Sequence, residues 1–164
     1  MATFGISSIL QNGDSRSRWV CVSAVAAFSG VLQSISWYCY SSTGTTQGFA
    51  LYDSDGSGGG PGTLLAVTVT GTMTNNVWNT LAISGTKPHL VAGHNYYLAF
   101  GANDVSHTAV TDTTTGSNSY CLMATNVTTY PTPAGSPFST TTPKNCSIYG
   151  TYTTSVNSAM FSFF

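Results

Sequence analysis

Charge is what this sequence has least of. Only 5% of its 164 residues are charged, with four Lys or Arg, five Asp and no Glu. An ordinary soluble domain has about a quarter charged residues. This scarcity excludes a basic face for nucleic acid, because phosphate binding needs clustered cations. It also leaves little repulsion between neighbouring copies, which favours a protein that packs against other molecules or works outside a cell.

Long hydrophobic runs are also missing, and no secretory signal is visible at the start of the sequence. No stretch approaches the roughly 20 apolar residues that a helix needs to cross a bilayer. Residues 1–5 lack the basic and apolar regions of a secretory signal. Three explanations fit an extracellular composition without a leader: a removed leader, a leaderless export route, or a virion protein made in the host cytoplasm and released by lysis. We favour the last and therefore expect a virion location, with an extracellular location as the alternative.

Groups for catalysis are scarce as well. A glycosidase usually needs two placed carboxylates, and the sequence offers only five Asp. No Gly-x-Ser-x-Gly elbow and no Cys–His signature is present. The spacing of His89, His94 and His107 matches no strong zinc signature. The sequence therefore predicts a protein that is not an enzyme.

The four cysteines are too few for a disulfide framework at this length. Cys21 and Cys39 fall in apolar runs, where a buried thiol is the ordinary outcome. Cys121 and Cys146 flank a long irregular segment. They form either a disulfide bridge that closes this loop or two free thiols, and the sequence leaves both open.

Hydroxyl, glycine and aromatic residues are abundant instead, with 26 Thr, 22 Ser, 17 Gly and 12% aromatics. Apolar residues recur with the period of strands: Ile35, Trp37 and Cys39 point to one face of the run 31–40 and polar residues to the other. Gly-rich and Asn-rich turns separate the runs, and the pattern predicts a single all-β domain over 1–164, an antiparallel β-sandwich of the jelly-roll kind. The other predicted strands are 19–25, 48–52, 64–69, 77–83, 95–100, 107–111, 120–124, 147–152 and 156–164.

Two segments are candidates for contact with other subunits. Four prolines in 125–145 exclude an interior strand or helix and favour an extended loop. This loop is either an arm laid over a neighbouring subunit or a solvated surface loop. The apolar end 156–164 is either a closing core strand or a subunit contact. The candidate contact residues are Tyr130, Phe138, Phe161, Phe163 and Phe164.

The sequons at Asn126 and Asn145 bracket the same loop and matter only in a secretory pathway. We interpret them as chance occurrences in a Thr-rich chain.

The run 53–60 imitates the first half of a calcium-binding loop. Asp53, Asp55 and Ser57 offer oxygens at alternate positions, as hard cations require. Leu64 stands where such a loop has its bidentate Glu. A Gly-rich connection with an Asx-turn is therefore the preferred interpretation. We predict no cofactor, with Ca²⁺ at these three residues as the alternative.

Aromatic side chains offer the remaining chemistry. Trp37, Trp78, Tyr96 and Tyr97 are candidates for stacking on sugars, although strand aromatics more often fill a core. Tyr96 and Tyr97 are adjacent in a predicted strand and must point to opposite faces. The pattern therefore predicts that at least one of them looks outward.

Residues 31–101, less than half of the chain, carry motifs that resemble a jelly-roll surface module of phage structural proteins and bacterial secreted or cell-surface proteins. The resemblance implies an architecture like that of carbohydrate-binding domains, without catalytic residues. The motifs are Phe49-Ala50-Leu51-Tyr52-Asp53, Gly59-Gly60-Pro61-Gly62-Thr63-Leu64-Leu65-Ala66, Val77-Trp78-Asn79-Thr80-Leu81 and Leu90-Val91-Ala92-Gly93-His94-Asn95-Tyr96-Tyr97-Leu98-Ala99-Phe100.

These observations predict a non-enzymatic structural protein of a virion surface, such as a phage capsid decoration or tail protein. It would act by self-assembly or capsid binding, with copies of itself or a capsid or tail protein as partners, and without nucleic acid or a membrane span. The alternatives are a carbohydrate-binding module or adhesin, and a secreted extracellular filament subunit.

Overall fold

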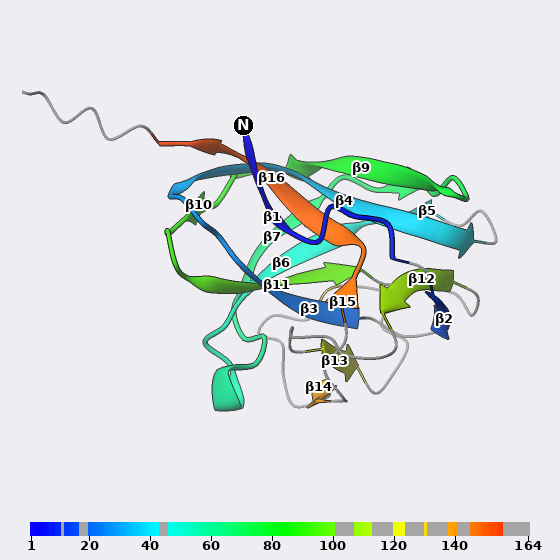
Figure 1. The fold of residues 1–164 in the computed structure, drawn as a ribbon. Helices are drawn as coiled ribbons and strands as arrows, with labels where there is room; N and C mark the ends of the chain where they lie inside the picture. Colours follow the sequence, from blue (N-terminus) through cyan, green and yellow to red (C-terminus); the bar gives the residue numbers. More distant parts are fainter. Residues whose placement is uncertain are drawn as a thin grey trace, which may run out of the picture.

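A computed structural model shows that the chain is built of antiparallel strands (Figure 1). The structure describes residues 1–10, 12–16, 20–42, 46–100, 107–112, 120–123, 130, 138–140 and 145–155. At 12–16, 42, 46, 107–112, 120–123 and 138–140 the description is of the backbone alone. The predicted strand 156–164 and most of the loop 125–145 lie outside these residues.

The all-β prediction is confirmed, and each strand pairing among the described residues is antiparallel. The helical element in this part of the chain is the short 3-10 turn η1 (Ser57–Gly59). No helix in the described ranges is long and apolar enough to cross a membrane. The strands are β1 (Ala2–Gly5), β2 (Asn12–Arg16), β3 (Val20–Val25), β4 (Gly30–Ser42), β5 (Thr46–Gln47), β6 (Phe49–Asp53), β7 (Leu64–Thr68), β8 (Gly71–Thr72), β9 (Val77–Ser84), β10 (His89–Leu90), β11 (Asn95–Phe100), β12 (His107–Asp112), β13 (Tyr120–Met123), β14 (Phe138–Thr140), β15 (Asn145–Cys146) and β16 (Ile148–Thr154).

Among the described residues, ten strands follow one path, in the order β1-β16-β4-β9-β7-β6-β11-β3-β13-β14, and the sheet curls toward a closed barrel. Off this path, β10 and β12 pair with β4, β2 and β15 pair with β12, and β5 pairs with β8 in a separate sheet. We call β1, β16, β4 and β9 the first layer, and β7, β6, β11, β3, β13 and β14 the second layer. In the view of Figure 1 the first layer lies above the second. The layers join where β9 pairs with β7, with Ser84 opposite Val67. This arrangement encloses the core and leaves one outer face on each layer.

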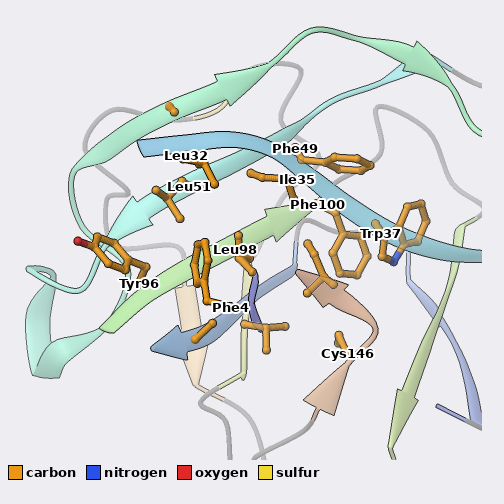
Figure 2. Packing of buried hydrophobic residues seen from close by; sticks show 14 of the residues in the cluster. Phe4, Leu32, Ile35, Trp37, Phe49, Leu51, Tyr96, Leu98, Phe100 and Cys146 are labelled. Atoms are coloured by element: carbon orange, nitrogen blue, oxygen red, sulfur yellow. The ribbon is translucent and has the colours of Figure 1, made fainter. Parts of the chain in front are cut away.

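The interlayer core is aromatic at its centre. Trp37 of β4 stacks on Phe100 of β11, with 4.7 Å between the ring centroids and 17° between the ring planes. Figure 2 shows these rings beside Phe49, which meets Trp37 edge to face at 6.2 Å. Ile35, Trp37 and Cys39 are fully buried, as the alternation in 31–40 predicts. Complete burial of such a side chain contributes roughly 1.5–3 kcal/mol to folding.

A second apolar cluster lies on the outer face of the second layer. It consists of Cys21, Ala50, Tyr52, Tyr97 and Ala99. The half-buried Tyr130 packs against this cluster, and its hydroxyl donates a 2.5 Å hydrogen bond to the carbonyl of Gly48. Tyr130 therefore covers this face at that point, although it comes from a distant part of the sequence.

The expectation that Tyr96 or Tyr97 looks outward is wrong, because Tyr130 packs over the outer cluster. The two side chains do point to opposite faces, but Tyr96 is buried in the interlayer core and Tyr97 in the outer cluster, at 2% and 3% exposure. The loop prediction for 125–145 also needs a correction, because Phe138–Thr140 forms β14. This short strand pairs with β13 at the edge of the sheet, a position in which neighbouring prolines are tolerated.

The cysteines are distributed over different parts of the fold. Cys39 and Cys146 belong to the interlayer core, whereas Cys21 belongs to the outer cluster. The register places Cys121 of β13 opposite Cys21 of β3. Because Cys146 lies on β15, which pairs with β12 and is no neighbour of β13, the arrangement does not favour a Cys121–Cys146 bridge.

Candidate functional site

The Gly-rich connection between β6 and β7 is a closed loop. At its neck the Asp53 amide donates to the Thr63 carbonyl at 2.8 Å, and the Gly62 amide donates to the Asp53 carbonyl at 2.9 Å. Gly58 and Gly59 have φ angles of 66° and 74°, a conformation that side chains with a Cβ rarely adopt. These two glycines are therefore explained by the backbone conformation of the turn.

Both Asp side chains of this loop are engaged by protein donors. Asp55 accepts hydrogen bonds from the Thr63 hydroxyl at 2.5 Å and from the Thr63 amide at 2.6 Å. These two bonds favour the charged carboxylate and lower the pKa of Asp55. Asp53 Oδ1 accepts from His94 Nε2 at 2.6 Å and from the Ser54 amide at 2.7 Å.

A calcium ion at Asp53, Asp55 and Ser57 would share the carboxylate oxygens with these hydrogen bonds. Ser57 contributes a carbonyl to the loop, which accepts from the Gly60 amide at 3.3 Å. In the part of the chain that the structure describes, no three His, Cys, Asp or Glu side chains gather as a metal site would need. Calcium binding by this loop stays a prediction.

His94 connects the loop to one end of the molecule. Its ring meets Tyr96 edge to face at 4.7 Å, and its side chain is 41% exposed. Its carbonyl accepts from the Ala26 amide at 3.2 Å, which ties the turn before β11 to the turn after β3. The Asp53–His94 pair therefore holds two connections together at this end.

Three exposed apolar side chains lie on these turns or at the strand end beside them. Val25, Phe28 and Val91 are 55%, 60% and 54% exposed. These turns are joined by hydrogen bonds from the Gly93 amide to the Ala26 carbonyl, 2.8 Å, and from the Ala92 amide to Ser29 Oγ, 3.0 Å. We call Val25, Phe28 and Val91 the end cluster.

The other surface concentration of chemistry is aromatic and lies on the outer face of the first layer. Tyr38 of β4 is directly opposite Trp78 of β9, and the ring centroids are 5.6 Å apart. Tyr149 of β16 approaches Trp78 from the other side of β4, at 4.9 Å. All three side chains are half-buried. We call Tyr38, Trp78 and Tyr149 the aromatic ledge.

The ledge covers Ser36, which lies beneath it. Ser36 of β4 is opposite both Tyr149 and Thr80, and its hydroxyl is 2.7 Å from that of Thr80. Ser36 shares the outer face with Tyr38, because alternate residues of a strand point to the same side. It is nevertheless only 1% exposed. The rings above it explain this burial.

The four residues that the sequence predicts to stack on sugars lie in different environments. Trp37, Tyr96 and Tyr97 are buried, so the structure corrects the prediction that they offer a face to a sugar. Trp78 alone of the four reaches the surface, and the structure adds Tyr38 and Tyr149 to it. The alternation around Trp37 already placed Tyr38 on the outer face. No sequence pattern around Tyr149 predicts its place at this site, because its position beside Trp78 depends on the pairing of β16 with β4.

The predicted subunit-contact residues are placed only in part. Tyr130 packs against the outer cluster of its own chain. Phe138 begins β14, where the backbone alone is described. Phe161, Phe163 and Phe164 lie outside the described residues, as does Asn126. Contact of these residues with another subunit stays a prediction.

Comparison of the chain with family models, curated proteins and solved structures finds no match.

Proposed function

We propose that this chain is a non-enzymatic structural protein of a virion surface, with the jelly-roll form of the antiparallel β fold. It acts by contact with copies of itself or with a capsid or tail protein. The observation that carries the proposal is the end cluster, in which Val25 at the end of β3 and Phe28 and Val91 on the adjoining turns stand exposed, and hydrogen bonds join those turns. A virion location follows from this function.

The surroundings of the end cluster have the composition of an interface. Protein interfaces have an apolar centre depleted of charge and a polar rim. Here the Asp53–His94 pair stands beside the turn of Val91, and Ser29 and Ala92 bond to one another. Complete burial of the three half-exposed side chains would contribute roughly 2 to 4 kcal/mol to association. Because the chain carries so little charge, few like charges oppose contact between copies.

Sedimentation velocity at several concentrations tests this proposal with a matched pair of variants. Phe28→Asp places a charge in the end cluster, where its burial would be costly. We expect the wild type to associate and Phe28→Asp to weaken association by about tenfold or more. Val69→Asp is the control, because Val69 is 46% exposed and lies beside Ala82, outside the cluster. Equal association of the two variants would contradict a role for the end cluster.

Carbohydrate binding is the second candidate function. It is favoured by a separate observation, the aromatic ledge, which stands on a different face from the end cluster. The two functions are compatible, since a virion protein that binds its neighbours at one end keeps a sheet face for a ligand.

A further inference from the structure

We propose that the aromatic ledge is a binding site for an uncharged oligosaccharide, with Trp78 as its central stacking residue. This inference deepens the second candidate function and does not depend on self-association. It commits to one occupant on three grounds: the arrangement of the rings, the absence of charged residues from the three strands that carry them, and the hydroxyl groups that border them.

The rings are held in place before any ligand arrives. The Tyr38 hydroxyl donates to the Asn76 carbonyl at 3.0 Å, which anchors that ring to the turn preceding β9. Asn79 braces the same turn, because its side chain accepts from the Thr74 amide at 2.8 Å and donates to the Thr74 carbonyl at 2.9 Å. Trp78 stands between Tyr38 and Tyr149 and contacts both. A site that is already ordered loses little entropy on binding, which favours affinity.

The strands that carry the ledge contain no charged residue. The sequences of β4, β9 and β16 are GVLQSISWYCYSS, VWNTLAIS and IYGTYTT. A nucleic acid or an acidic glycan would need clustered cations at the ledge to offset its own charge. These strands supply none, and Lys87, which bonds to Gln33 of β4, is a single cation three residues along the strand from Ser36. The chemistry of the surface therefore favours a neutral ligand.

Hydroxyl groups border the rings. Ser34 and Thr151 face one another in the next row of the same outer face, and Thr80 is exposed beside Trp78. A sugar ring has an apolar face of C–H groups and a rim of hydroxyls. Its face can lie on an aromatic ring while its hydroxyls bond to Ser and Thr, so both parts of the ligand find partners.

A second copy of the chain fits this face less well. A stable protein interface buries about 800 Å² on each partner and has a continuous apolar centre. The ledge offers three half-buried rings, with exposed Tyr40 farther along β4 on the same outer face and Ser and Thr side chains around them, so its apolar area is small and interrupted by polar groups. A ligand of a few sugar units matches the smaller area.

The experiment begins with the wild-type protein on an array of immobilised neutral oligosaccharides (glucans, mannans, galactans and xylans) and acidic ones (sialylated and uronate-containing). The neutral oligosaccharide with the strongest signal is then titrated against each variant. We expect Trp78→Ala and Tyr149→Ala to bind it about tenfold more weakly or worse, since stacking on one aromatic ring is worth at least a severalfold change in affinity. Phe28→Ala removes an aromatic ring from the end cluster instead and should bind within twofold of the wild type.

Trp78→Phe keeps the proposal testable if Trp78→Ala fails to fold. This variant keeps a ring at the site and removes the indole, so it should still bind while the ligand-induced change in tryptophan fluorescence disappears. Retention of acidic glycans only, or of no neutral glycan, would overturn the proposal. Equal binding by folded Trp78→Ala and the wild type would do the same.

Failure of this proposal is distinguishable from failure of the assembly proposal. A monomeric wild type that binds a neutral glycan through Trp78 contradicts assembly alone. Loss of self-association in Trp78→Ala, with Phe28→Ala unaffected, would show that the ledge is an interface between copies and would overturn the glycan site.

Discussion

Trp37 and Phe100 stack nearly parallel across the core, and this contact joins the two layers of the fold at 4.7 Å between centroids. The two residues come from β4 and β11, so the stack depends on long-range closure of the sheet. Both side chains are buried, at 0% and 2% exposure.

Removal of this stack should destabilise the protein strongly. We expect Phe100→Ala to lower the free energy of unfolding by about 3–5 kcal/mol, because it leaves a cavity against Trp37. Phe28→Ala deletes the same type of side chain at a position that is 60% exposed. It should change the free energy of unfolding by less than about 1 kcal/mol. Urea denaturation of both variants measures the difference. Equal losses would contradict the assignment of Phe100 to the core.

Gly150 is predicted to be intolerant of a side chain. A Cβ at this position would meet the ring of Phe4, which lies opposite it in the pairing of β1 with β16. Gly150→Ala should cost about 1–3 kcal/mol, the usual range for overpacking. At Gly48 an added Cβ finds its nearest neighbour, Thr68 Oγ1, at 3.5 Å, so Gly48→Ala is the matched control and should be nearly neutral. Thermal unfolding compares the two, and a neutral Gly150→Ala would contradict the placement of Phe4.

Stability should fall in alkaline solution. Burial raises the pKa of the Cys39 thiol from 9.0 to about 11. Below pH 9 the thiol is protonated in both the folded and the unfolded chain, so its full contribution to the free energy of unfolding is present. Between pH 9 and pH 11 the unfolded chain releases this proton and the folded chain retains it, so the free energy of unfolding decreases by up to roughly 2–3 kcal/mol.

Cys39→Ala isolates this contribution. Burial also raises the pKa of Tyr52, Tyr96 and Tyr130, and their effect on alkaline stability persists in the variant. Urea midpoints measured at intervals from pH 8 to pH 11 should therefore fall less steeply in Cys39→Ala than in the wild type. Identical slopes would show that Cys39 titrates normally in the folded protein.

The Asp55 carboxylate offers a local test of the β6–β7 loop. Its pKa is lowered chiefly by the hydroxyl of Thr63 and next by the Thr63 amide. Carboxyl carbon chemical shifts followed by NMR should give a higher titration midpoint in Thr63→Val than in the wild type. The midpoint should remain below that of an unperturbed Asp, since the amide still donates. Thr70→Val, an exposed change outside the loop, should leave the midpoint of Asp55 unchanged.

Local alternation was sufficient to predict most of the strands. The run around Ile35, Trp37 and Cys39 has a clear inward face, and β4 extends from Gly30 to Ser42. Strand β1 was not predicted, because Ala2–Gly5 is too short to show an alternation of apolar and polar residues. It is recognisable only through its partner, where Phe4 fills the space over Gly150.

The candidate sites were less predictable, because their residues meet through the sheet rather than along the chain. Tyr97 alternates correctly and faces away from the core, yet a side chain more than 30 residues later, Tyr130, packs over the cluster that contains it. Tyr149 and Trp78 belong to strands that β4 separates, so their contact follows from two registers that no local pattern encodes. Exposure of an aromatic residue is therefore a property of the whole fold.

The native mass of the wild-type protein, measured by light scattering across a concentration series, tests the central claim most directly. The claim is that this nearly uncharged chain works by contact with other protein molecules, and its self-association is the form of that claim that the mass measurement tests. It predicts that the mass rises with concentration to a defined multiple of the 17.1 kDa chain. A mass that stays at the monomer value up to the highest concentration attainable would contradict it.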